Sequence, residues 1–147
     1  MITSVHHTSF TVKDMKRSIA FYRDILAMKV LYDSVLEGIE YKGPIADQVT
    51  GCPGTEQHVV FMGIGESFLE LVQYIPPGKP LVGNRASDVG SAHICFKTED
   101  IDGLYQKLLK NNVTVHCSPQ KVGVALLIYF RDPDGIILEA IEGKTRV

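Results

Sequence analysis

Two histidines and two glutamates recur at matching places in two similar stretches of this chain. The stretch from His7, HTSFTVKDMKRSIAFY, aligns without a gap with the stretch from His93, HICFKTEDIDGLYQKL. Each half also contains a glutamate near its end, Glu70 within FLELVQY and Glu139 within IILEAIE. Imidazole nitrogens and carboxylate oxygens together suit divalent ions such as Ni, Zn, Co, Mn or Fe. Any one of these residues alone is typical of an ordinary polar strand position, but their repetition favours a metal site.

Such a site requires the four side chains to share one face of a sheet. Side chains alternate along a strand, so His7 points away from the face of Phe10, which a helix would cover. The same alternation applies to His93, and Glu70 and Glu139 each stand between two apolar residues. We therefore predict that both pairs point into one concavity and bind one divalent ion per site, with about two coordination positions open to a substrate.

The repeated stretches predict a short strand followed by an amphipathic helix in each half. In both copies apolar residues recur at i, i+3, i+4 and i+7, which is the stripe of a helix that packs on a sheet. Asp14 or Thr98 is placed to cap the helix N-terminus, and the helices are expected to end near Leu26 and Asn111. Further strands are predicted at residues 29–36, 58–62, 67–74, 114–118, 124–130 and 136–141.

The order of elements in both halves is therefore βαβββ, within a single domain of residues 1–147. Module one covers residues 1–75, a linker covers 76–90 and module two covers 91–147. The linker contains two consecutive prolines and three glycines, which suit neither helix nor strand. A second irregular stretch, from Gly38 to Gly54, has no counterpart in module two and is predicted to be an ordered loop over a binding site.

Composition excludes several classes of protein. Hydrophobic residues make up 45% of the 147 residues and charged residues 22%, as in ordinary globular domains. The net charge of −2 is spread along the chain, so we expect no nucleic-acid partner. No apolar run reaches the ~20 residues of a membrane span, and no secretory signal is recognisable, so we expect a cytoplasmic protein. The three cysteines form no CxxC pair, which favours reduced thiols.

Four segments together resemble the vicinal oxygen chelate superfamily, which includes glyoxalase I, bleomycin-binding proteins and extradiol dioxygenases. They are VHHTSFTVKDMKRSIAFYRDIL, FLELVQY, AHICFKTEDID and RDPDGIILEAIE, and they cover nearly the whole chain. The resemblance implies an α+β fold in which two tandem βαβββ modules form an open half-barrel mixed sheet with helices on the outer face. It places the metal ligands at His7, Glu70, His93 and Glu139, with His7 preferred over His6 by spacing. It also implies a homodimer.

The ligand set His, Glu, His, Glu resembles that of glyoxalase I. This implies a metal-dependent lyase or isomerase acting on a small carbonyl compound, thiol adduct or thioester. The reaction would be proton abstraction through a metal-bound enediolate, with Glu139 as the base and Glu70 serving the opposite face. The alternatives are a methylmalonyl-CoA epimerase-like enzyme, a ring-cleaving dioxygenase, an epoxide-opening resistance transferase, and a non-catalytic drug- or metabolite-binding protein of the bleomycin-resistance type. A full set of four ligands argues against a pure binder.

The remaining polar candidates are assigned structural or surface roles. Residues 132–135, DPDG, are predicted to form a turn that sets the register of the Glu139 strand, and Cys95 to be a small wall residue of the site. The others are interpreted as rim, loop or solvated positions: His6, Tyr41, Lys42, His58, His116 and Arg131.

Overall fold

The chain divides into two compact units, Met1–Pro80 and Leu81–Val147. The computed structural model describes residues 1–144, so residues 145–147, which end the predicted second module, lie outside the described part. The boundary between the two units falls inside the predicted linker of residues 76–90.

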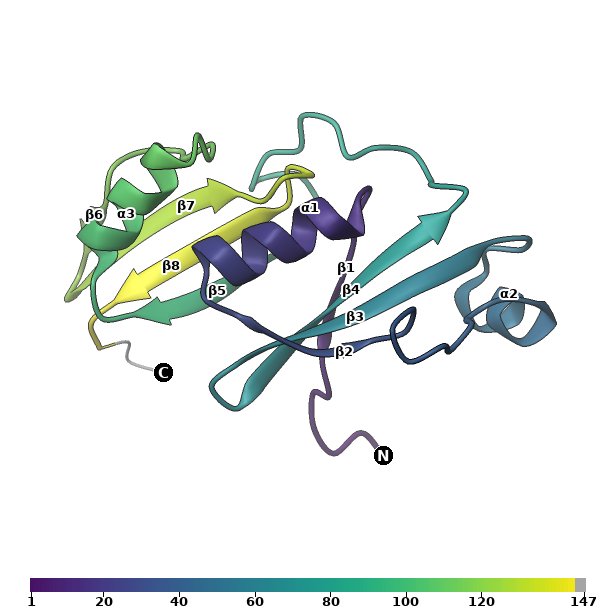
Figure 1. The fold of residues 1–147 in the computed structure, drawn as a ribbon. Helices are drawn as coiled ribbons and strands as arrows, with labels where there is room; N and C mark the ends of the chain where they lie inside the picture. Colours follow the sequence, from purple (N-terminus) through teal and green to yellow (C-terminus); the bar gives the residue numbers. More distant parts are fainter. Residues whose placement is uncertain (145–147) are drawn as a thin grey trace. The chain divides into compact units, whose positions relative to one another are not determined.

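The first unit is a four-stranded mixed sheet (Figure 1), and a helical segment of the same unit packs against it. The elements of this unit are β1 Thr8–Thr11, α1 Met15–Ala20, β2 Lys29–Asp33, α2 Pro44–Thr50, β3 Glu56–Ile64 and β4 Ser67–Ile75. A π-helical turn, Phe21–Ile25, extends α1. The strand order is β1-β4-β3-β2, with β1 parallel to β4 and the other pairs antiparallel.

The second unit repeats this plan without a counterpart of α2. Its strand order is β5-β8-β7-β6, and β5 runs parallel to β8 as β1 does to β4. Its elements are β5 His93–Thr98, α3 Ile101–Lys110, β6 Gln120–Val122, β7 Ala125–Arg131 and β8 Ile137–Glu142. The predicted α+β class and the βαβββ repeat are thus confirmed, with two open four-stranded sheets that do not close into a barrel.

Helices α1 and α3 each pack on one face of their own sheet, and the His–Glu side chains lie on the other face. Helix α1 contacts β4, and α3 contacts β7 and β8. Buried apolar residues lie on both sides of these contacts, in the predicted apolar stripes of the helices and in the strands that face them. Burial of this apolar surface drives the packing of helix on sheet. The nearly or fully buried side chains are Met15, Tyr22, Met62, Leu69 and Leu71 in the first unit and Ile101, Leu108, Ile128, Phe130 and Leu138 in the second.

Aspartates cap both of these helices. The backbone N–H of Arg17 donates to the carboxylate of Asp14 over 3.0 Å, as expected for an N-cap. In the second unit the cap is Asp100, which accepts the N–H of Gly103 over 2.8 Å. The expectation that Thr98 caps this helix was therefore wrong. Thr98 instead accepts the N–H of Asp100 through its hydroxyl oxygen, and so helps to hold the capping residue in place.

Two regions differ from the sequence-based expectation. The stretch from Gly38 to Gly54, predicted to be irregular, contains α2, which has Pro44 in its first turn and Gly51 in the left-handed conformation after its last residue. The strand predicted at 114–118 is replaced by β6, and Val115 makes only an isolated bridge to Phe130. Strand β6 forms because Gly123, with φ of 62°, allows a tight hairpin directly into β7.

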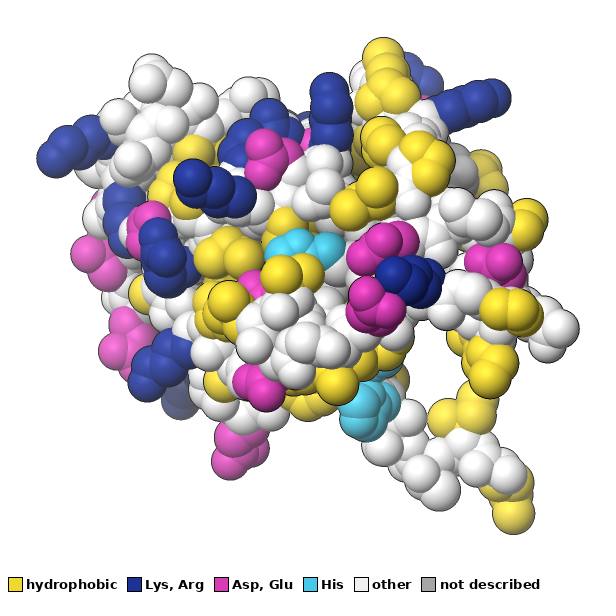
Figure 2. Space-filling view, turned by 45° about the vertical axis from the view of Figure 1, so that its right-hand side comes forward, with side chains coloured by type: hydrophobic (Ala, Val, Ile, Leu, Met, Phe, Trp, Pro, Cys, Tyr) yellow, Lys and Arg dark blue, Asp and Glu magenta, His cyan; other side chains and the backbone are white. Residues whose placement is uncertain are grey.

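The surface is mixed in charge. Figure 2 shows lysine and arginine side chains interspersed with aspartate and glutamate on the face in view, in keeping with the net charge of −2. Among the described residues, no helix combines the length and the apolar character needed to cross a lipid bilayer.

Candidate metal centre

The first His–Glu pair lies on the uncovered face of the first sheet. His7 directly precedes β1, and Glu70 in the middle of β4 is in register with Ser9 of β1. His7 Nε2 lies 3.4 Å from Glu70 Oε2, and both side chains are partly exposed. Phe61, opposite Glu70 on β3, and Phe68, two residues before it, contact the imidazole ring of His7. The pair therefore sits against an aromatic wall.

The second pair occupies the equivalent place in the second unit. His93 begins β5, and Glu139 in β8 is in register with Cys95 of β5. His93 Nε2 lies 3.0 Å from Glu139 Oε2. Glu139 is only 7% exposed, which makes it one of the few buried charged residues among those described. A carboxylate this deep needs polar partners, and His93 supplies one.

His6 has a more direct part than the rim position that the sequence suggested. Its Nδ1 lies 2.8 Å from Nδ1 of His7, so one of the two nitrogens carries the hydrogen of a hydrogen bond. Its ring also meets Phe68 edge-on. A hydrogen bond to one imidazole nitrogen fixes the orientation of the ring and leaves the other nitrogen able to bind a second partner. His6 therefore directs Nε2 of His7 towards Glu70.

The donor atoms fit a divalent ion by type and spacing. Two neighbouring ligand atoms, each ~2.0–2.2 Å from the same ion, stand about 2.8–3.6 Å apart in octahedral or tetrahedral arrangements. The His7–Glu70 and His93–Glu139 separations of 3.4 and 3.0 Å fall in this range. The described residues include no group of three or more His, Cys, Asp or Glu side chains that could hold an ion together, so neither pair gains a third such side chain within its unit. Each unit thus brings its candidate histidine and glutamate into contact, and the binding of one ion by all four residues stays a prediction.

Cys95 lies beside Glu139 on the same face. Burial, followed by the nearby charge of Glu139 and a hydrogen bond to it, raises the pKa of the Cys95 thiol to about 11. The thiol is therefore protonated near neutral pH, whereas a nucleophilic cysteine needs a thiolate. This favours the predicted role of Cys95 as a small wall residue.

The other two histidines have partners that sequence reasoning missed. His58 is half-buried, and its Nε2 lies 2.7 Å from Asp33 Oδ1 on the helix-covered face of the sheet. His116 stacks on Tyr129 and accepts a hydrogen bond from Nε of Arg131 over 3.2 Å. Burial and the charge of Arg131 lower the pKa of His116. The expected surface or loop-proximal position is correct for His116, which is exposed and lies between α3 and β6, and wrong for His58, which is half-buried within β3.

Arg131 and Asp132 hold the turn before β8. The guanidinium of Arg131 donates to Asn84 Oδ1, to the Asn84 carbonyl and to the Gly135 carbonyl at 2.7–2.8 Å, so its expected solvated role was wrong. Buried Asp132 accepts the N–H groups of Asp134 and Ile136. The predicted turn at residues 132–135 is confirmed, and it aligns Ile137 with Arg131 at the start of β8.

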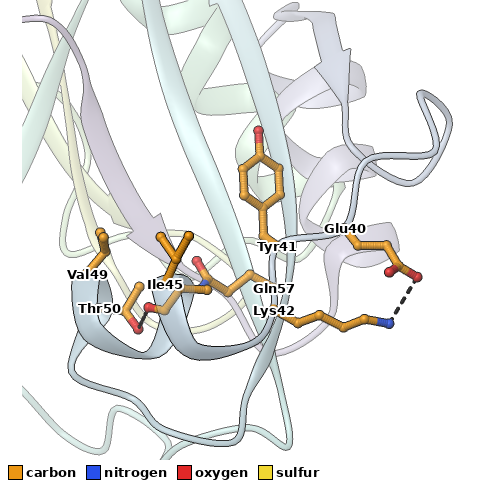
Figure 3. Close-up of a pocket in the computed structure, with 8 residues that line it drawn as sticks. Glu40, Tyr41, Lys42, Ile45, Val49, Thr50 and Gln57 are labelled. Carbon is orange, nitrogen blue, oxygen red and sulfur yellow. Dashed lines mark hydrogen bonds and ion pairs between the residues drawn. The ribbon is translucent and has the colours of Figure 1, made fainter.

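A pocket is lined by part of the segment from Gly38 to Gly54, which was predicted to be a loop over a binding site and contains α2 (Figure 3). It encloses about 290 Å³, and Ile45 and Val49 of α2 face it across from Gln57 of β3. Lys42 at its edge is paired with Glu40 over 3.0 Å. The hydroxyl oxygen of Tyr41 lies 3.2 Å from that of Tyr32, whose ring contacts Phe61 of the aromatic wall. The pocket thus connects through two tyrosines to the wall beside His7.

The fold and the site define a class of two-module α+β proteins with one His–Glu pair in each module. The model of the Glyoxalase/Bleomycin resistance protein/Dioxygenase superfamily matches residues 4–140. The chain belongs to this superfamily.

Two lactoylglutathione lyases and one solved structure are similar to nearly the whole chain. The chain is 32% identical over 142 residues to a lactoylglutathione lyase of Salmonella typhimurium, covering 94% of this chain and 91% of that one. It is 33% identical over 140 residues to a lactoylglutathione lyase of Escherichia coli O157:H7, with the same coverage. The crystal structure of a glyoxalase family protein from Bacillus cereus superposes with a TM-score of 0.79 at 21% identity, covering 97% of this chain and 95% of that one. The last likeness supports the fold.

Proposed function

We propose that the protein is a metal-dependent lyase or isomerase of the glyoxalase I type. The observation that carries this proposal is the pair of His–Glu contacts at equivalent positions of the two modules. The lactoylglutathione lyases at 32% and 33% identity support the same reaction class. The substrate is a small carbonyl compound joined to a thiol, and the exposed, unpaired cysteines suit a reducing, cytoplasmic setting.

His7, Glu70, His93 and Glu139 are the residues that would hold one divalent ion, whether Ni, Zn, Co, Mn or Fe. All four offer nitrogen or oxygen donors, and each His–Glu pair has the spacing of neighbouring ligands. When bound, such an ion polarises a carbonyl group and stabilises the negative charge that develops on its oxygen.

Glu139 is the proposed base. Its burial removes competing water, and its hydrogen bond to His93 fixes the carboxylate. In a hemithioacetal, the Glu139 carboxylate takes the proton from the carbon that bears sulfur and hydroxyl and returns it to the neighbouring carbonyl carbon. A second proton passes in the same direction, from the hydroxyl on the sulfur-bearing carbon to the oxygen of the former carbonyl group. The product is therefore a 2-hydroxyacyl thioester, and no oxidant is needed. Glu70 performs the corresponding role on the opposite face of the substrate.

The activity test uses the protein loaded separately with Ni²⁺, Zn²⁺ or Co²⁺. Methylglyoxal is mixed with glutathione, cysteine or coenzyme A to form hemithioacetals, and thioester formation is followed by absorbance. We expect turnover with at least one metal and one thiol, and loss of turnover after chelation. Methylmalonyl-CoA, catechol and fosfomycin are assayed in parallel. Turnover of one of these and of no hemithioacetal would contradict the proposal.

Glu139→Gln tests the base. Glutamine keeps an oxygen for the ion but accepts a proton poorly, so we expect bound metal to be retained and turnover to fall about 10²- to 10⁴-fold. Incorporation of solvent deuterium into the product should fall in parallel. Glu66→Gln, in the exposed turn between β3 and β4, is the control and should behave as wild type. Wild-type turnover by metal-loaded Glu139→Gln would exclude Glu139 as the base.

A further inference from the structure

Tyr129 faces the Glu139 carboxylate from the neighbouring strand. It lies directly opposite Glu139 in the antiparallel pair of β7 and β8, so both side chains project from the same face. The phenolic oxygen of Tyr129 lies 3.4 Å from His93 Nε2, and the two rings are 5.2 Å apart. Glu139 Oε2 lies 3.0 Å from the same His93 Nε2. A phenol is protonated near neutral pH, so the Tyr129 hydroxyl, placed opposite Glu139, can donate to the carboxylate.

The ring of Tyr129 is held from its other side. His116 stacks on it with 6.0 Å between ring centroids and 23° between planes. The backbone N–H of His116 also donates to the Tyr129 carbonyl over 2.8 Å. Arg131, anchored to Asn84 and Gly135, donates to the His116 ring. Arg131 holds His116 and His116 holds the ring of Tyr129, so the phenolic hydroxyl of Tyr129 is kept in one position.

The first unit lacks an equivalent donor. Across β5, β8 and β7 the register aligns Cys95, Glu139 and Tyr129. Across β1, β4 and β3 it aligns Ser9, Glu70 and Phe61. A phenylalanine therefore stands opposite Glu70 where the second unit has a tyrosine. The two glutamates of the repeat therefore have unequal neighbours. Glu139 stands between Cys95 and Tyr129, and Glu70 stands between Ser9 and Phe61, so only the row of the second unit contains a phenolic hydroxyl.

Resting on the function proposed above, we propose that Tyr129 is a positioning residue that donates its phenolic hydrogen to Glu139 and fixes this carboxylate beside His93. Glu70 has no such donor across from it and is oriented by His7 and the aromatic wall. The hydroxyl thus distinguishes the glutamate assigned as base from its counterpart in the repeat. Loss of a hydrogen-bonding partner behind a ligand typically costs ~10- to 100-fold in metal affinity or activity.

The test is Tyr129→Phe, which keeps the ring and its stacking on His116 but removes the hydroxyl. Purified metal-free protein is titrated with Co²⁺, and both the affinity and the visible absorption spectrum of the bound ion are recorded. We expect affinity about 10- to 100-fold weaker than wild type and an altered spectrum. With the hemithioacetal substrate, kcat should fall while KM stays close to wild type. Circular dichroism confirms that the variant is folded.

Tyr105→Phe is the matched control, because Tyr105 lies on α3 of the same unit, away from the His–Glu pair. It should bind Co²⁺ with wild-type affinity and spectrum. Equal affinity, spectrum and kcat for Tyr129→Phe and wild type would overturn the role of Tyr129 while leaving the proposed function intact. Failure of the wild-type protein to bind Co²⁺, Ni²⁺ or Zn²⁺ would overturn the proposed function, and the role of Tyr129 with it.

Discussion

At the scale of single residues, the candidate site depends on hydrogen bonds that select one orientation for each imidazole. His7 is bonded at Nδ1 to His6, so its Nε2 faces Glu70. His93 directs Nε2 to Glu139, within reach of the Tyr129 hydroxyl. Polar groups that must bind an ion gain from such pre-orientation, because less conformational freedom is lost on binding.

Metal content tests the ligand assignment. We expect about one divalent ion per chain in the wild-type protein, measured by elemental analysis after equilibration with Ni²⁺ or Zn²⁺. His7→Ala and His93→Ala should each lose most of it, since each removes a nitrogen donor. His58→Ala is the control: its ring pairs with Asp33 on the other face, so metal content should be unchanged. Wild-type metal content in His7→Ala would show that the site is misassigned.

At the scale of elements, local sequence signals fix where helices begin and end. Asp14 and Asp100 cap α1 and α3, and Pro44 with Gly51 bounds α2. The end of the first helical segment departs from the usual pattern, because Ala27 has φ of 59° where a glycine is favoured. An alanine in this conformation costs about 1–2 kcal/mol.

Ala27→Gly should therefore stabilise the protein. Relief of left-handed strain is partly offset by the greater freedom of glycine in the unfolded chain, so we expect the free energy of unfolding to rise by about 0.5–1 kcal/mol. Urea denaturation measures the change. Ala20→Gly, at a right-handed position with φ of −58°, is the control and should destabilise by about 1 kcal/mol. Equal destabilisation by both substitutions would contradict the interpretation.

At the scale of the whole molecule, the chain contains two units with the same βαβββ order of elements, and each unit has a His–Glu pair at the equivalent place. The first copy carries an addition, the segment with α2 and its pocket. The repeat gives each module a His–Glu pair, and the addition distinguishes the first module from the second.

We expect the protein to be a homodimer, because the superfamily resemblance implies it and two-fold dimers are the commonest closed assembly. Light scattering coupled to size exclusion at micromolar concentration should give twice the 16.3 kDa mass of the chain. A mass of 16.3 kDa under these conditions would contradict the expectation. Dilution of a sample that shows the dimer mass distinguishes a weak dimer, which dissociates, from a tight one.

The sequence by itself determined the features that depend on local periodicity. Alternation along strands predicted that His7 and His93 would lie on the face away from the helix, beside Glu70 and Glu139, and both pairs form. The helix stripes predicted the buried core positions, and the DPDG turn predicted the start of β8. These signals are readable because a strand or helix repeats its geometry every few residues.

Only the tertiary structure decided which distant side chains meet. The partnership of His58 with Asp33 and the placement of Tyr129 across from Glu139 depend on how β2 pairs with β3 and β7 with β8. The choice of β6 over residues 114–118 depends on the hairpin at Gly123. Register between strands is set by the turns and by packing of the whole sheet, so a side chain's partner across the sheet cannot be read from its neighbours in sequence.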